Sequence, residues 1–88
     1  MKWTKNLYQK AIAKYGKDAQ IEQLEEELAE LTLAIKHYKK GKVTLDDVIT
    51  ELVDVDIMVE QTRMILEIDD KVYYKHKEHK KKRLEKRL

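Results

Sequence analysis

Apolar positions recur at helical spacing along most of the chain. Trp3, Leu7, Ala11 and Tyr15 recur every four residues, which predicts a first helix over about residues 2–15. From about 18 to 40, apolar steps of three and four residues alternate, as in a helix packed along its whole length. The positions of this seam are Ile21, Leu24, Leu28, Leu31, Ile35 and Tyr38. Because the chain has no proline and its two glycines stand where these helices are expected to end, the pattern predicts an all-α fold.

A third helix is predicted over about residues 45–67 and a fourth over about 69–88. Thr44 is the expected N-cap of the third helix, and Asp47 stands three positions later, as in a capping box. Between Leu52 and Val59 this helix is apolar on nearly every side, and so short a chain has too few helices to cover it. We therefore expect a bundle of about four helices that is completed by homo-oligomerisation.

Three smaller expectations concern single residues of the first two helices. Asp18 is the expected N-cap of the second helix, because it stands just before the seam begins. Trp3 and Tyr38 are expected to pack in the core rather than to stack on a ligand, since aromatic residues at helical spacing are more often core. His37 is expected at the surface, near the end of the second helix.

Four carboxylates are expected to meet between the second and third helices. Residues three apart on a helix lie about 60° apart around its axis and one turn apart along it. Glu27 with Glu30, and Glu51 with Asp54, therefore each point two carboxylates the same way. If the helices pack side by side, these charges repel one another strongly unless a hard cation neutralises them.

The alternative reading of Glu26, Glu27 and Glu30 is a solvated, salt-bridged helix face in a chain that is 41% charged. Glu51 and Asp54 favour the metal site, because they interrupt the most apolar stretch of the chain, where unpaired carboxylates are costly. Asp47 is set aside as a helix-start residue. Asp56 lies about 160° around the helix from Asp54, so a salt bridge or a subunit contact is its expected role. His76 and His79 have the spacing of a transition-metal pair, but the surrounding cations oppose that role.

Length and composition narrow the class of protein. With 88 residues, the chain is expected to be one domain spanning residues 1–88, with a marginal core of its own. It has no cysteine, which excludes disulfides and thiolate metal sites, and no apolar run that would span a bilayer. We expect a cytoplasmic protein without a membrane partner.

Charge is divided unevenly along the chain. Residues 1–70 hold 10 Lys/Arg and 15 Asp/Glu, a net charge of −5, whereas residues 71–88 hold 9 and 2, a net charge of +7. An acidic body with a basic C-terminal helix suits an anionic ligand, a nucleic acid or simple solubility. Composition does not choose among the three.

The acids match a family pattern. Glu26-Glu27-x-x-Glu30, followed after a turn by Glu51-x-x-Asp54, resembles the EExxE…ExxD signature of the MazG-like all-α nucleoside triphosphate pyrophosphohydrolases, which include dimeric dUTPases and dCTP pyrophosphatases. The resemblance to short phage and Gram-positive members covers nearly the whole chain. It extends to Tyr15-Gly16-x-x-Ala19-Gln20, to Val53-Asp54-Val55-Asp56-Ile57-Met58 with Gln61, and to Lys80-x-x-Arg83-Leu84.

This resemblance implies a helical bundle that forms a homodimer, sometimes a dimer of dimers, and binds Mg²⁺, with Mn²⁺ as a substitute. The residues that match the metal ligands are Glu27, Glu30, Glu51 and Asp54. Glu26 matches a leading acid that orients water or a second metal ion. Lys80 and Arg83 match an element that contacts phosphate, and Gln20 matches a position near the nucleotide pocket.

The implied activity is hydrolysis of a nucleoside triphosphate to the monophosphate and pyrophosphate by a metal-activated water. A covalent route and a P-loop are excluded, because the chain has neither serine nor cysteine nor a glycine-rich loop. Two alternatives stay open. One is a non-enzymatic helical dimer that binds nucleic acid through its basic tail, and the other is a carrier of the fold that has lost activity or serves as an assembly partner.

Overall fold

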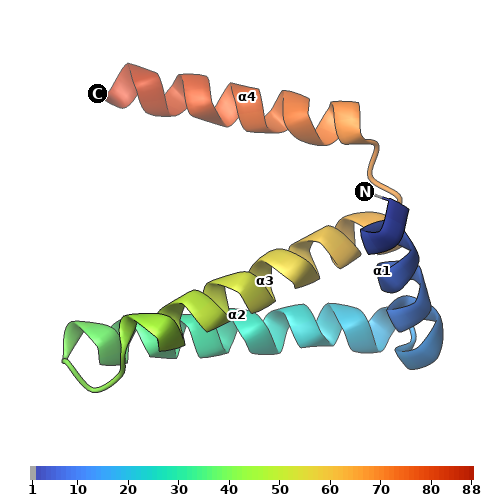
Figure 1. Ribbon diagram of the computed structural model, residues 1–88. Coiled ribbons are helices and arrows are strands. Elements are labelled where there is room, and N and C mark those ends of the chain that lie inside the picture. Colours follow the sequence, from blue (N-terminus) through green and yellow to red (C-terminus); the bar gives the residue numbers. More distant parts are fainter. Residues whose placement is uncertain (1) are drawn as a thin grey trace.

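The structure, a computed structural model, describes residues 2–88 (Figure 1). Over these residues it has no strand and four helices: α1 (Lys2–Tyr15), α2 (Lys17–Lys39), α3 (Leu45–Ile65) and α4 (Asp70–Arg87). The predicted all-α fold is confirmed, and every predicted helix end lies within two residues of the observed one. None of these helices is long and apolar enough to cross a membrane.

The α2–α3 hairpin begins with a Schellman motif at the end of α2. The backbone N–H of Lys42 donates to the carbonyl of His37 (2.9 Å), and that of Gly41 donates to the carbonyl of Tyr38 (3.0 Å). Gly41 has a φ of 71°, a conformation in which glycine has no steric penalty. The motif satisfies the last carbonyls of α2 and turns the chain back along it.

α3 starts with the predicted capping box, which is confirmed. The Thr44 hydroxyl accepts a hydrogen bond from the backbone N–H of Asp47, and the Asp47 carboxylate accepts one from the backbone N–H of Thr44 (2.8 Å). These bonds to the ionised carboxylate lower the pKa of Asp47, first through the Thr44 backbone and then through its hydroxyl. Asp47 is therefore committed to the helix start, as expected.

The junction between α1 and α2 differs from the prediction. α2 begins at Lys17, with Gly16 at the capping position (φ 92°) and no side-chain capping bond, so the prediction of Asp18 as N-cap is wrong. Glycine is favoured there because the sharp turn out of α1 requires a positive φ. Asp18 lies in the first turn of α2 instead, where the helix dipole favours a negative charge.

α2 packs on α3 through only part of its apolar seam, in which Ile21, Leu24 and Leu31 are half-buried. The side chains of α2 that are buried or half-buried include Gln20, Glu27 and Ala34, which lie on one flank of that seam, while Leu28 and Tyr38 on the seam are 45% and 46% exposed. The helix is thus rotated so that its polar flank faces α3. The prediction that Tyr38 packs in the core is wrong for the single chain.

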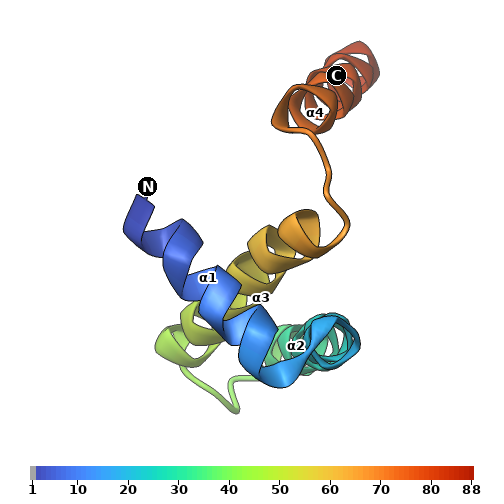
Figure 2. The same ribbon diagram turned by 90° about the vertical axis from the view of Figure 1, so that its right-hand side faces the viewer.

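α1 crosses one end of the hairpin (Figures 1 and 2) and packs through Tyr8. Burial, a hydrogen bond with Glu60 and the charges of Glu60 and Asp56 raise the pKa of the Tyr8 hydroxyl to about 12. Trp3 is 72% exposed, so the prediction that it packs in the core is also wrong. The contact face of α1 lies one position away from the predicted stripe.

α3 ends two residues earlier than predicted because a second Schellman motif closes it. The N–H of Ile68 donates to the carbonyl of Arg63 (3.0 Å), and the N–H of Glu67 donates to that of Met64 (3.1 Å). Glu67 adopts a φ of 53°, an uncommon conformation for a residue other than glycine. Because residue 67 is not a glycine, the sequence does not indicate a turn at this position.

α4 stands away from the other helices and is held only at its start (Figure 2). The Arg63 guanidinium bonds the Asp70 carboxylate at 2.9 Å and lies over the Tyr73 ring, 3.7 Å from its centroid. Asp69 caps the helix by accepting from the N–H of Lys71 (2.7 Å). The radius of gyration is 15.6 Å, whereas a compact domain of this length has about 12 Å.

The capping box gives a test of the hairpin. Replacing Thr44 by Ala removes its hydroxyl bond and is expected to lower the free energy of unfolding by about 1 kcal/mol. For a domain of this size, that lowers Tm by about 4–8 °C in a circular-dichroism melt. Thr32→Ala is the control, because the Thr32 hydroxyl only donates to the Leu28 carbonyl on an exposed face of α2. Equal effects of the two changes would show that the box adds nothing.

Candidate metal site

Three carboxylates meet between α2 and α3. Glu27 comes from the middle of α2, and Glu51 and Asp54 come from successive turns of α3. One carboxylate oxygen of each residue lies within 4.8 Å of the others, and all three residues are half-buried. The antiparallel hairpin sets this arrangement, because it brings the acidic flank of α2 against the side of α3 that carries both acids. The structure therefore joins two sequence motifs that are separated by a turn.

The other two predicted acids lie further out. Glu30 is exposed, one turn along α2 from Glu27, and does not belong to the group of three carboxylates whose oxygens all lie within 4.8 Å of one another. Its charge still acts on Glu27, so it lies at the rim of the cluster. Glu26 is exposed, since one residue along a helix is a rotation of about 100°. Roles for these two acids stay predictions.

Burial and neighbouring charges both act on Glu27. Burial raises the pKa of this carboxyl, the charges of Glu30 and Asp54 raise it further, and a hydrogen bond from the Gln23 amide to Oε1 (2.7 Å) opposes them. The Oε2 atoms of Glu27 and of Glu51 are buried without a hydrogen-bond partner. Buried carboxylate oxygens of this kind fit a hard cation such as Mg²⁺, which prefers oxygen ligands.

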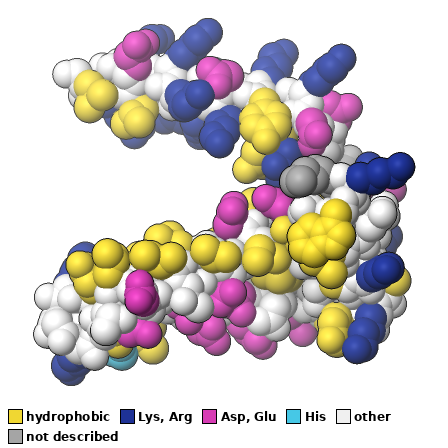
Figure 3. Space-filling model, viewed as in Figure 1, with side chains coloured by type: hydrophobic (Ala, Val, Ile, Leu, Met, Phe, Trp, Pro, Cys, Tyr) yellow, Lys and Arg dark blue, Asp and Glu magenta, His cyan; other side chains and the backbone are white. Residues whose placement is uncertain are grey.

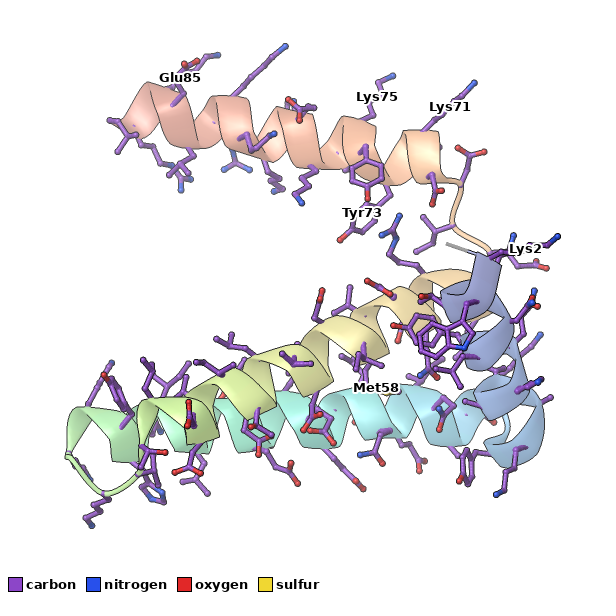
Figure 4. The ribbon with its side chains drawn as sticks, viewed as in Figure 1. Lys2, Met58, Lys71, Tyr73, Lys75 and Glu85 are labelled. Carbon is purple, nitrogen blue, oxygen red and sulfur yellow. The ribbon has the colours of Figure 1, made fainter. Side chains whose placement is uncertain are left out.

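A buried hydrogen bond holds the two helices in register beside the acids. The Gln20 amide donates to the Gln61 carbonyl oxygen at 2.7 Å, and both side chains are buried. Gln20 lies two turns before Glu27 and Gln61 two turns after Asp54, so the pair marks one side of the site. Met58, which lies between Asp54 and Gln61 along α3, is buried where α3 faces α2 (Figure 4). The predicted contact of Gln20 with nucleotide stays a prediction, and the contact that the structure does show is with α3.

A cavity of about 350 Å³ lies on the other side of the acids, toward the turn. It is lined by Glu30, Leu33, Ala34, His37, Val43, Asp47, Thr50 and Glu51. Ala34, on the same flank as Glu30, leaves room here because its side chain is small. His37 is half-buried here rather than at the surface as predicted. Its position seven residues after Glu30 was the available signal, because residues seven apart share a helix face.

The predicted phosphate-binding cations lie on α4, away from the acids. Lys80 and Arg83 are exposed, and α4 makes no backbone contact with α2 or α3. Within residues 2–88, the ion pairs join Arg63 to Asp70 and Lys81 to Glu78, and none involves the acid cluster. His76 and His79 are also exposed, and in this part of the chain neither belongs to a group of possible metal ligands.

The raised pKa of Glu27 predicts that its charged carboxylate destabilises the metal-free fold at neutral pH but is needed to bind the metal ion. The pKa of Glu27 in the folded protein lies above the unfolded value of 4.5. The protonated carboxyl therefore contributes its full stability at pH values below 4.5, and this contribution is lost as the pH rises through the folded pKa. Glu27→Gln keeps the shape of the side chain but removes its charge. In EDTA at pH 7 we therefore expect the Tm of this variant to exceed the parent Tm by a few degrees, since each kcal/mol of unfolding free energy shifts Tm by about 4–8 °C in a domain of this size.

Adding Mg²⁺ is expected to reverse that order. The parent Tm rises with the Mg²⁺ concentration, because the ion binds only the folded protein, whereas the Tm of Glu27→Gln rises little. Glu25→Gln, on the outward face of α2, is the matched control and is expected to behave like the parent in both conditions. A lower Tm of Glu27→Gln in EDTA would contradict the charge repulsion described here.

Comparison with known proteins does not assign this site. No family model matches the chain, and no curated protein and no solved structure matches it either. The family resemblance therefore depends on the acids of the signature and on the neighbouring residues that accompany them. Three of those acids, Glu27, Glu51 and Asp54, share one half-buried site in the structure.

Proposed function

We propose that this protein is a Mg²⁺-dependent nucleoside triphosphate pyrophosphohydrolase of the MazG-like kind. It would hydrolyse a (d)NTP to the nucleoside monophosphate and pyrophosphate. The observation that carries the proposal is the cluster of Glu27, Glu51 and Asp54, in which two buried carboxylate oxygens have no protein partner. A chain that only needed a stable hairpin would gain from apolar residues at these positions.

The three clustered acids would hold the ion, with Glu30 close enough to join from the rim. Mn²⁺, with a similar preference for oxygen ligands, is an expected substitute. When bound, the ion supplies positive charge to the phosphates and lowers the pKa of a water molecule. The site suits this role because its ligands come from two rigid helices, which fixes their spacing before substrate arrives.

The chain's own groups would then position substrate and accept a proton. Water attacks the α-phosphorus, the bond to the bridging oxygen breaks, and pyrophosphate leaves with that oxygen. Glu26 and Glu27 are the candidate catalytic acids, and a carboxylate oxygen that the ion does not engage would take up the proton of the water. The adjoining cavity, with His37 and Thr50 in its wall, offers room for part of the nucleotide next to the acids.

The proposal extends to assembly and to the basic helix. We expect a homodimer or homotetramer, since α3 exposes apolar side chains along the face opposite α2. Lys80 and Arg83 lie far from the acids of their own chain, so a role in phosphate binding would require them to come from a neighbouring subunit. The tail charge of +7 supplies the electrostatic attraction for a triphosphate in either case.

Pyrophosphate release tests the activity. A panel of canonical and damaged (d)NTPs is incubated with the protein in Mg²⁺ and, separately, in EDTA. We expect release with Mg²⁺ only, and a loss of at least about 100-fold in kcat/KM for Glu51→Gln and for Asp54→Asn, or about 2.7 kcal/mol of transition-state stabilisation. Both changes keep the side-chain shape, so helical content and oligomeric state are expected to be unchanged. Glu22→Gln, which points away from α3, serves as the control.

Other outcomes would favour the alternatives. Unchanged release in Glu51→Gln would contradict the metal site. If no substrate is hydrolysed and Mg²⁺ does not raise Tm, the chain carries the fold without the activity. The exposed basic α4 favours nucleic-acid binding as the second candidate, and that function predicts salt-sensitive DNA or RNA binding that is lost when Lys81, Lys82 and Arg83 are changed together to Gln.

A further inference from the structure

The face of α3 opposite α2 is apolar and uncovered. Leu45, Ile49, Leu52 and Val53 are between 45% and 55% exposed and lie along this face, which is the hydrophobic band on the upper edge of the hairpin in Figure 3. Further along the same face, beyond this band, the helix becomes acidic with an exposed Asp56 and a half-buried Glu60. Exposed apolar patches of this extent mark interaction surfaces.

α4 presents a matching face toward the hairpin. Tyr73 points toward α3, whereas Lys71 and Lys75 point to the opposite side (Figure 4). Lys77, Lys80 and Leu84 follow Tyr73 at intervals of four, seven and eleven residues, so they lie on the same side of the helix as Tyr73. This side is therefore aromatic at its start, basic in its middle and apolar at its end.

The two faces are complementary in one register. α4 runs antiparallel to α3, and Arg63 contacts Asp70 and Tyr73 where the helices meet (Figure 1). When this antiparallel register is extended, Lys77 comes opposite Glu60 and Lys80 comes opposite Asp56. Leu84 then comes opposite Leu52, so opposite charges face each other and apolar residues face apolar ones. Yet α4 stands off α3, and these pairs are not formed within the chain.

The single chain exposes more surface than a compact monomer of the same mass. It exposes 7467 Å², whereas a compact monomer of 10.6 kDa exposes about 5,500 Å². The excess is about 2,000 Å² per chain, and two copies that bury it would share an interface of about 4,000 Å², the size of an obligate homodimer. Packing α4 on α3, in the same chain or in a second copy, leaves Leu28, Ile35 and Tyr38 of α2 exposed. A second copy is favoured as the occupant because the Arg63 contacts hold the start of α4 in a position from which the rest of the helix stands off its own α3.

We propose that two copies of this chain exchange their C-terminal helices. The α4 of each copy packs on the exposed face of α3 of the other, with Lys80 against Asp56 and Leu84 against Leu52 across the interface. The segment 66–69 is the connection that lets α4 leave its own body, and the Arg63 contacts with Asp70 and Tyr73 fix the start of α4. This inference does not depend on the proposed catalytic activity. It pairs Lys80 with Asp56, which lies about 160° around α3 from Asp54, so in the exchanged dimer Lys80 is an interface residue and does not contact phosphate.

Disulfide cross-linking tests the exchange directly, because the chain has no native cysteine. Two full-length variants, Leu52→Cys and Leu84→Cys, carry tags of different mass, are mixed, refolded together and oxidised mildly. We expect a mixed disulfide to form as the main product on a non-reducing gel. The matched control pairs Leu52→Cys with Lys75→Cys, on the opposite side of α4, and is expected to give little mixed product.

The double variant Leu52→Cys/Leu84→Cys separates exchange from closure. Exchange gives a product of twice the chain mass, whereas closure of α4 onto its own α3 gives a monomer without free thiols. A closed monomer, an absence of cross-links, or equal cross-linking of Lys75→Cys would each overturn the proposal.

A charge reversal checks the same interface without cysteine. We expect Asp56→Lys and Lys80→Glu each to raise the dimer dissociation constant by on the order of tenfold or more, measured by sedimentation, because each places like charges together. The double variant is expected to recover most of the affinity. Lys71→Glu makes the same charge change on the opposite side of α4 and is expected to have no effect. A double variant no better than the single ones would contradict the pairing.

Discussion

The contact between the polar flank of α2 and α3 is the constraint on which the structure depends. By facing α3 with Gln20, Glu27 and Ala34, α2 half-buries a carboxylate beside two others and turns Leu28 and Tyr38 outward. The cost is visible at Glu27, whose pKa burial raises. Burying the whole seam, with Leu28 and Tyr38, would add apolar contact, so the observed rotation gives up part of the hydrophobic burial while it brings the acids together.

The same rotation explains why the isolated chain has so thin a core. Its buried apolar residues are Tyr8, Val48, Met58 and Ile65, and none of the described side chains falls below 2% exposure. The apolar side chains displaced from the α2–α3 contact lie at the surface, together with the face of α3 that α4 does not reach. The acid cluster and the exposed apolar residues of α2 are thus two results of the same helix rotation, whereas the exposed face of α3 results from the position of α4.

Much of this fold was predictable because its signals are local. The helix ends follow from Gly41 and the Thr44–Asp47 box, whose geometry involves only neighbouring residues. Convergence of Glu27, Glu51 and Asp54 was also predictable, since a turn between two long helices makes them neighbours. The rotation of α2 was not, because the seam and its flank are both compatible with a helix, and tertiary contacts such as Gln20–Gln61 decide between them. The exposure of Trp3 and the end of α3 at Ile65, followed by a positive-φ turn at Glu67 without a glycine, could not be predicted for similar reasons.

The contacts between helices have a consequence for the order of folding. α2 packs mainly on α3, its successor in sequence, and α1 adds itself to their end, so most tertiary contacts join segments that are close along the chain. Such chains have a low contact order and fold quickly, on a scale of about microseconds to milliseconds. α4 has no such neighbour to fold against. The hairpin would therefore form first, and under the proposed exchange the docking of α4 would be a slower, bimolecular step whose rate depends on protein concentration.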